Sequence, residues 1–149
     1  SSDVCSSDLD TLEGLISYLT AFAQEFTSGA NVACRLDLPD RMPVLPLSAE
    51  VRHNVFLAAK EAIHNAVRHG RAQVIGIALQ IQPGVFTLTI SDDGAGFLVG
   101  APAGPRLGHG LENMRARLAA IGGECEIRSQ PHVGTTIRLT VKVSADGAV

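Results

Sequence analysis

The sequence of 149 residues lacks long apolar runs, an excess of basic residues and paired cysteines. A membrane-spanning helix needs about 18 consecutive apolar residues, and residues 74–79 are among the longest such runs here. Twelve lysines and arginines stand against 15 acidic residues, and the net charge of −3 argues against direct nucleic-acid binding through a basic surface. Three cysteines without a CxxC motif are typical of a reduced, cytoplasmic protein.

Residues 1–9 read SSDVCSSDL, a polar string without periodicity that gives way abruptly to a helical pattern. The string can be encoded by a nucleotide sequence that resembles a widely used sequencing-library adapter, which favours translated adapter as its origin. An ordinary disordered tail is the alternative. On the adapter hypothesis the natural protein extends upstream, and this chain is its C-terminal piece.

Helical and strand patterns alternate along the rest of the chain. Apolar spacing predicts helices over residues 12–26, 48–69 and 111–121. Alternation of apolar and polar residues predicts strands over residues 32–38, 73–81, 85–91, 124–129 and 135–143. Residues 98–110 are dominated by Gly, Ala and Pro, and we expect them to form a mobile loop. This order predicts an α+β sandwich in which helices cover one face of a mixed sheet.

The second helix carries polar residues along one side. Glu61 and Asn65 are one turn apart, and Arg68 and His69 continue the stripe. A carboxylate, an amide oxygen and a cation so arranged could hold Mg²⁺, a water and a phosphate. The alternative is the solvated polar face of an amphipathic helix. His64 and His69 are five residues apart and point in different directions, so we do not expect a zinc site.

Three glycine-containing motifs follow. Asp92, Gly94 and Gly96 come directly after a strand, where the glycines allow a sharp turn and the carboxylate could accept a hydrogen bond from an amino group. A surface turn is the alternative. Residues 108–111, GHGL, could cradle a phosphate with free backbone amides. Residues 134–136, GTT, open the last strand. Neither GxGxxG nor a Walker motif is present.

In this order the four motifs resemble the N, G1, G2 and G3 boxes of the GHKL superfamily of ATP-binding domains, which includes gyrases, heat-shock chaperones, histidine kinases and mismatch-repair ATPases. The segments that carry the resemblance are EAIHNAVRHG, DDGAG, GHGLENMRARLAAIGGE and GTTIRLTV, within residues 45–143. They look most like bacterial sensor histidine kinases whose response regulators carry a helix-turn-helix domain. The resemblance implies a Bergerat-type fold, a two-layer α/β sandwich with a mostly antiparallel sheet.

The resemblance also implies which residues bind ATP at its adenine end. Asp92 would accept a hydrogen bond from the exocyclic amine of adenine, with Gly94 and Gly96 shaping the pocket. Thr135 would support Asp92 there.

At the phosphate end, the resemblance implies that Asn65 coordinates Mg²⁺. Glu61 would orient or deprotonate the attacking group and could reach the metal through a water. Arg68 would contact phosphate, and His69 ends the same box with a less defined role. Gly108 and Gly110 would hinge residues 98–110 as a lid over the triphosphate. Leu111, which ends the third motif, would also belong to the nucleotide-binding site.

The implied function is that of a histidine kinase domain, which passes the γ-phosphate of Mg-ATP to a histidine on an upstream helical dimerisation domain. No histidine of this chain matches that phosphoacceptor, so we expect no autophosphorylation by the isolated fragment. Residues 10–30 are either the end of the dimerisation domain or a helix of the ATP-binding domain, which would span residues 31–143 before a tail at 144–149. The implied partners are ATP or ADP and a response regulator, for a homodimer in the cytoplasm or anchored in the inner membrane through further segments.

Two other functions are compatible with the same motifs. An anti-sigma regulator of this superfamily, which phosphorylates serine, has a similar first box. A non-catalytic sensor would bind ATP without transferring its phosphate. Glu61 also permits hydrolysis by a directed water, as in the chaperone and gyrase branches.

Overall fold

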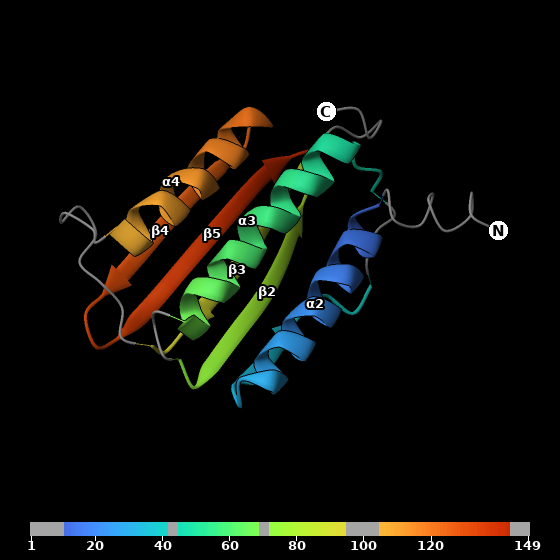
Figure 1. Ribbon diagram of the computed structural model, residues 1–149. Helices are drawn as coiled ribbons and strands as arrows, with labels where there is room; N and C mark the ends of the chain where they lie inside the picture. The colour runs from blue at the N-terminus through green and yellow to red at the C-terminus, as the bar shows by residue number, and fades with distance from the viewer. Residues whose placement is uncertain (1–10, 42–44, 69–71, 95–104, 144–149) are drawn as a thin grey trace.

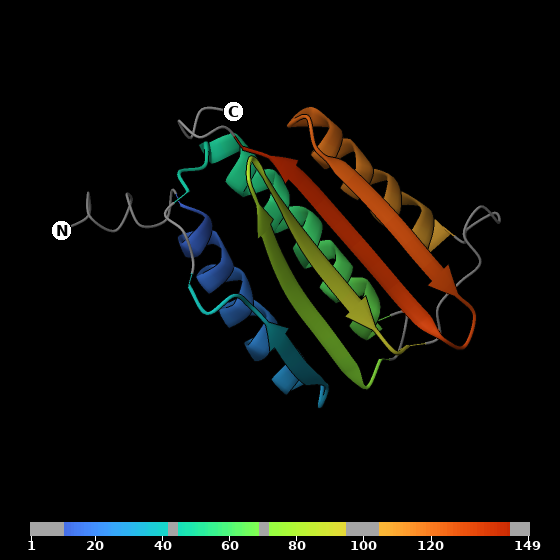
Figure 2. The same ribbon diagram turned by 180° about the vertical axis from the view of Figure 1, so that it is seen from behind.

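The computed structural model describes residues 11–41, 45–68, 72–94 and 105–143, with residues 105–111 described by their backbone alone. In these ranges the chain forms three helices and five strands in two layers (Figure 1). The helices are α2 (Leu12–Gly29), α3 (Ala49–Arg68) and α4 (Pro105–Ala120), and the strands are β1 (Ala33–Asp37), β2 (Val74–Gln82), β3 (Val85–Asp92), β4 (Glu124–Gln130) and β5 (Gly134–Lys142). All three helices cover the same face of the sheet, and its other face carries no described helix (Figure 2). The predicted α+β sandwich is confirmed.

The five strands form one sheet in the order β1-β2-β3-β5-β4. Strand β1 pairs with β2 in parallel, and each other neighbouring pair is antiparallel. The β2–β3 hairpin turns at Gly84, whose φ of +77° suits glycine because this residue has no Cβ to clash with the backbone. The predicted mixed, mostly antiparallel sheet is therefore confirmed.

Helix α3 lies between α2 and α4 and packs on the centre of the sheet (Figure 1). It begins where the sequence predicts, because the hydroxyl of Ser48 accepts a hydrogen bond from the N–H of Val51 at 3.1 Å. Its buried face is built largely from alanines, among which Ala58 and Ala59 are fully buried. Small side chains let the helix axis lie close to the sheet, and this packing fixes the opposite, polar side of α3.

Helix α2 packs into the same core as the sheet. It starts at a cap in which Thr11 Oγ1 accepts from the N–H of Gly14, and its buried side chains, which include Leu12 and Leu19, join those of the strands in one cluster. The buried side chains of α2 therefore belong to the same core as those of the sheet. The domain boundaries given above remain predictions.

Helix α4 starts earlier than its apolar spacing predicts. The helix begins at Pro105 rather than at residue 111, so residues 105–110 belong to its first two turns and not to a loop. Proline suits the first position of a helix, where its missing N–H would have no intrahelical partner, and the two glycines 108 and 110 do not prevent helix formation. Residues 95–104, the rest of the expected loop, lie outside the described residues.

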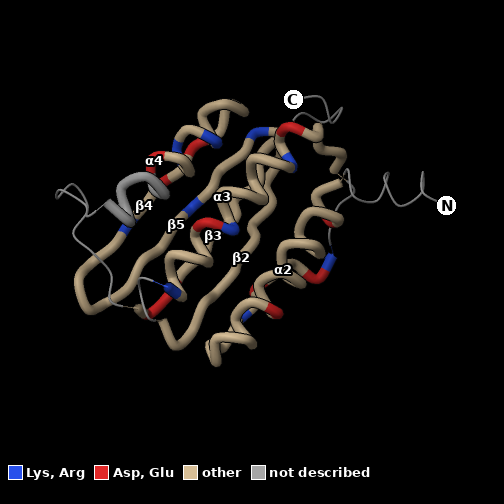
Figure 3. The backbone as a smooth tube through the Cα atoms, viewed as in Figure 1, with Lys and Arg blue, Asp and Glu red and all other residues tan. Residues whose placement is uncertain are grey.

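Charges of both signs are interspersed along the described helices and strands (Figure 3). None of the described helices is both long and apolar enough to cross a bilayer.

Candidate functional site

A row of polar side chains closes one end of the core on the helix-covered face of the sheet. Residues two apart along a strand point to the same face. The buried isoleucines that pair across β3, β5 and β4 are Ile90, Ile137 and Ile127. Two residues further toward the same sheet end, the register partners are Asp92, Thr135 and Ser129. A carboxylate and two hydroxyls therefore stand where a further apolar layer would otherwise lie.

The carboxyl group of Asp92 is half-buried and held by backbone amides. The N–H of Gly94 donates to its Oδ1 at 2.8 Å, and the N–H of Thr135 on the neighbouring strand donates to the same carboxyl group. Burial raises the pKa of Asp92, and these two amide donors oppose the rise. The carboxylate is thus a fixed hydrogen-bond acceptor at the rim of the core.

Asp93, the next residue, has a different role. Its Oδ1 accepts hydrogen bonds from the N–H groups of Gln73 at 2.9 Å and Val74 at 3.0 Å, and so joins the end of β3 to the start of β2. The amide donors, that of Val74 first, lower the pKa of Asp93. Of the two adjacent carboxylates, one therefore stabilises the backbone and the other points into the polar row.

Gly134 allows the strands to approach closely beside this row. Its φ is +133°, and a Cβ added there would collide with the carbonyl oxygen of Asp92. The carbonyl of Gly134 accepts a hydrogen bond from Ser129 Oγ at 3.2 Å. The same Oγ lies 2.8 Å from Thr135 Oγ1. Ser129 thus contacts both residues that adjoin Asp92 on β5.

The polar side of α3 supplies a second group of side chains. Glu61 and Asn65 lie on successive turns, both partly buried, and Arg68 is exposed at the last position of the helix. The amide nitrogen Nδ2 of Asn65 is buried and has no hydrogen-bond partner among the described residues. A buried amide without a partner is costly, so this side chain is available for a ligand.

These two groups lie at the same end of the molecule. In Figure 1 the C-terminal end of α3, the end of β3 and the start of β5 meet at the lower left, beside the start of α4. The backbone confirms this proximity, because the N–H of Asp93 donates to Val74 and that of Ala72 to Ala66, which joins α3 to the start of β2. The arrangement can offer acceptors and donors to one polar ligand from the sheet and from the helix.

The side chain of His64 packs between helices α3 and α2. Its ring stacks on that of Phe26 from α2, with centroids 4.5 Å apart and planes within 9°, and burial lowers its pKa. This histidine joins α2 to α3 and faces away from the polar row.

Comparison with known proteins decides the family. Residues 50–145 match the family of histidine kinase-, DNA gyrase B- and HSP90-like ATPases. The chain belongs to this family. It is an ATP-binding catalytic domain of the kind that sensor histidine kinases carry.

Two relatives are sensor proteins of bacteria. The nitrate/nitrite sensor protein NarQ of Escherichia coli is 34% identical over 78% of this chain and 20% of its own length. The sensor histidine kinase YdfH of Bacillus subtilis is 30% identical over 86% of this chain and 31% of its own length. The chain therefore spans about a third or less of the length of these two relatives.

A solved structure shows the same fold. The histidine kinase domain of a blue-light-activated kinase from Erythrobacter litoralis superposes with a TM-score of 0.69, at 18% sequence identity, over 86% of this chain and 60% of that one. The two-layer arrangement is thus the fold of a histidine kinase ATPase domain.

Within this ATPase domain, the structure brings part of the predicted site together. Asp92, Gly94 and Thr135 adjoin one another at the sheet end, and Glu61, Asn65 and Arg68 lie on the last turns of α3. Gly96 and His69 lie outside the described residues. The other three predicted residues lie in the first two turns of α4 and are described by their backbone: Gly108, Gly110 and Leu111. Their roles stay predictions.

Ser129 and the backbone contacts of Asp93 belong to this sheet end but are not among the residues that the sequence predicts. The signal for Ser129 is its position two residues after the buried Ile127 on β4, where a polar residue replaces the expected apolar one. Asp93 has no comparable signal, because its partners Gln73 and Val74 are about 20 residues away in the sequence.

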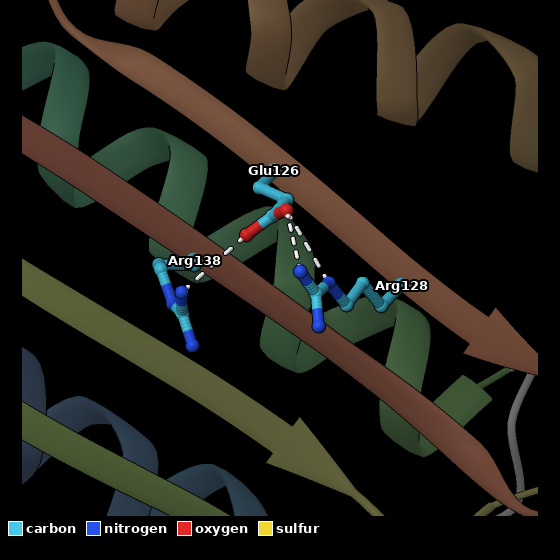
Figure 4. A network of polar contacts seen from close by, with 3 residues as sticks. All are labelled: Glu126, Arg128 and Arg138. Carbon is cyan, nitrogen blue, oxygen red and sulfur yellow. Dashed lines mark hydrogen bonds and ion pairs between the residues drawn. The ribbon is translucent and has the colours of Figure 1, made fainter.

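The clearest ion-pair network lies on the other face of the sheet. Glu126 Oε2 is 3.1 Å from a guanidinium nitrogen of Arg128, and its Oε1 is 3.5 Å from one of Arg138 (Figure 4). All three side chains are well exposed, so solvent screens the network and it contributes little to stability. It takes no part in the polar row, which faces the helices.

Proposed function

We propose that this ATPase domain binds Mg-ATP at the polar end of the sheet and delivers the γ-phosphate to a histidine on a helical domain upstream. One observation carries the proposal: the fixed carboxylate of Asp92 lies at the same end of the molecule as the buried, unpartnered amide of Asn65. The names of its relatives support the assignment to a sensor kinase.

Asp92 would bind the adenine. Ionised carboxylate oxygens only accept hydrogen bonds, and the 6-amino group of adenine is a donor. The amides of Gly94 and Thr135 hold the carboxyl group in place before the base arrives, so little ordering is needed on binding. Gly96 would allow the backbone to approach the base.

The residues of α3 fit a magnesium-bound triphosphate. Mg²⁺ is held by oxygen ligands and is usually bound through one or two side chains together with substrate phosphates. Asn65 offers one amide oxygen as a ligand, and its orphaned Nδ2 offers a donor to a phosphate oxygen. When bound, the ion neutralises the charge of the phosphates during transfer.

Glu61 and Arg68 would complete the phosphate end. Glu61, one turn before Asn65, would orient the attacking imidazole or accept its proton, and it could also bind the metal through a water. Arg68, exposed at the end of α3, would contact phosphate oxygens. His69 and the residues Gly108, Gly110 and Leu111 would enclose the triphosphate from the neighbouring segments.

The partners follow from this reaction. A phosphohistidine formed on an upstream dimerisation domain would be passed to a response regulator, and the whole kinase would act as a homodimer with this domain in the cytoplasm.

A radiolabelling experiment tests the proposal. The chain is incubated with γ-³²P-ATP and Mg²⁺, alone and together with the upstream domain encoded in the full gene. We expect ATP binding in both samples and acid-labile, base-stable label, as phosphohistidine gives, only when the upstream domain is present. Acid-stable label on serine would favour the anti-sigma type of kinase. ATP binding without any label would favour a non-catalytic sensor, and either result would contradict the proposal.

A further inference from the structure

A short path of backbone contacts joins the two ends of the proposed nucleotide site. Asp92, at the end of β3, is followed directly by Asp93, and Asn65, near the end of α3, is followed directly by Ala66. The N–H of Ala72 donates to the carbonyl oxygen of Ala66 at 3.1 Å. The chain that leads from Ala72 into β2 completes the path between the adenine end and the phosphate end.

The side chain of Asp93 closes this path. Its Oδ1 accepts hydrogen bonds from the N–H of Gln73 at 2.9 Å and from that of Val74 at 3.0 Å. The backbone N–H of Asp93 in turn donates to the carbonyl oxygen of Val74 at 3.4 Å. The residue next to Asp92 is therefore tied directly to the segment that follows α3.

These contacts continue the sheet beyond its last paired residues. The ladder between β2 and β3 ends at the pair Ile75–Asp92, and the N–H groups of Gln73 and Val74 lie past that pair. Asp93 supplies one carboxylate oxygen to both of them. Without this acceptor the two amides would have to turn to solvent, and the start of β2 would be held less firmly.

We propose that Asp93 is a positioning residue for Mg-ATP: by holding the start of β2, it sets the place of Asn65 relative to Asp92. The inference rests on the proposed binding of the base at Asp92 and of the metal-bound phosphates at Asn65. One ligand gains from two contact points only if it can reach both at once, and that gain falls when their separation is not fixed. Asp93 would act through the backbone and would not itself contact the nucleotide.

The test measures the affinity for ATP by calorimetry, once with Mg²⁺ and once with the metal removed by a chelator. In Asp93→Ala we expect the affinity for Mg-ATP to fall about tenfold, because the phosphates and the base no longer reach Asn65 and Asp92 together. Metal-free ATP, held mainly at the base, should bind nearly as in wild type. The loss of an acidic charge alone would have the opposite sign, since it favours the binding of a polyanion.

Three further variants separate positioning from charge and from general stability. Asp93→Asn removes the same charge but keeps an acceptor oxygen, so it should show a smaller loss than Asp93→Ala. Asp37→Ala is the matched control, because it makes the same substitution at an exposed aspartate of β1, and it should bind Mg-ATP as wild type does. Asn65→Ala combined with Asp93→Ala should lose little more than Asn65→Ala alone, since both changes act on one contact.

Amide hydrogen exchange tests the contacts of Asp93 without any nucleotide. In Asp93→Ala the N–H groups of Gln73 and Val74 should exchange faster than in wild type, by a larger factor than the amides in the middle of β3. An equal factor throughout would show a general loss of stability and would overturn the local role of Asp93.

The outcomes distinguish the two proposals. If wild type does not bind ATP, or gains no affinity from Mg²⁺, the proposed function fails and this inference fails with it. If wild type shows that gain but folded Asp93→Ala binds Mg-ATP as tightly, or loses affinity equally with and without Mg²⁺, only the role of Asp93 is overturned. If Asp93→Ala does not fold, Asp93→Asn provides the test, and wild-type affinity for Mg-ATP in that variant would overturn the inference.

Discussion

Thr135 of β5 lies directly opposite Asp92 of β3 in the sheet, and its backbone N–H donates to the Asp92 carboxyl group. The relationship joins two motifs that are more than 40 residues apart in the sequence. It explains why a carboxylate can be kept half-buried at the end of an apolar core: the sheet that buries it also supplies the amide that holds it.

Replacing Gly134 should disturb the sheet end more than any other described glycine. In Gly134→Ala the new Cβ meets the Asp92 carbonyl oxygen, and the backbone keeps a φ of +133°, so we expect a loss of about 1–3 kcal/mol in the free energy of unfolding. Urea denaturation measures this loss. Gly29→Ala at the end of α2 is the control, because a Cβ there has no atom within 4 Å. Equal stability of the two variants would contradict the close approach.

Asp93 should make stability depend on pH. The amides of Val74 and Gln73 lower its pKa in the folded protein, so its contribution is present above the unfolded pKa of about 4 and is lost as pH falls through the folded value. We expect Asp93→Asn to be less stable than wild type at pH 7, with a difference that shrinks toward pH 3. Denaturation at both pH values measures it.

A carboxylate elsewhere provides the comparison for Asp93. Asp37→Asn removes an exposed acidic group from the edge strand β1 and so reports the effect of charge alone. A stability difference for Asp93→Asn that stays constant from pH 7 to pH 3 would rule out the role of its ionised form in joining β3 to β2.

Much of the fold could be predicted because its helices and strands are amphipathic and are separated along the sequence by turns. Apolar and polar residues alternate in β2 and β3, and alanines line one face of α3; each pattern indicates which side is buried. Ser48 indicates the start of α3 because its hydroxyl makes a local hydrogen bond there. The start of α4 could not be predicted in this way. Its first two turns hold two glycines and a proline, a composition that local patterns associate with loops.

The candidate site was predictable only where motifs mark it. Asp92 directly follows one predicted strand, and Thr135 begins another. Glycines lie beside both residues, so the sequence motifs indicate them. The hydrogen bonds of Ser129 and Asp93 depend on which strands are neighbours and in which register. Those relationships come from the tertiary structure, and no local pattern contains them.

Asn65 should couple Mg²⁺ to nucleotide binding. Its buried amide is placed to bind the metal-bound phosphates, so in Asn65→Ala we expect the gain in ATP affinity on adding Mg²⁺ to fall about tenfold, while metal-free ATP binding is partly retained. Calorimetry with and without Mg²⁺ measures both. Asn54→Ala is the control, because that amide donates to Glu50 within the exposed part of α3. An unchanged magnesium effect in Asn65→Ala would remove Asn65 from the phosphate end.

The most direct test of the account is the affinity of Asp92→Asn for Mg-ATP. The change removes the charge and one acceptor oxygen from the group that would bind the adenine amine, and we predict a loss of about 1–3 kcal/mol in binding free energy. Asp37→Asn should bind as wild type does. Isothermal titration of the folded proteins gives the answer: weakened binding in Asp92→Asn alone supports adenine recognition at this sheet end, and wild-type affinity in that variant would contradict it.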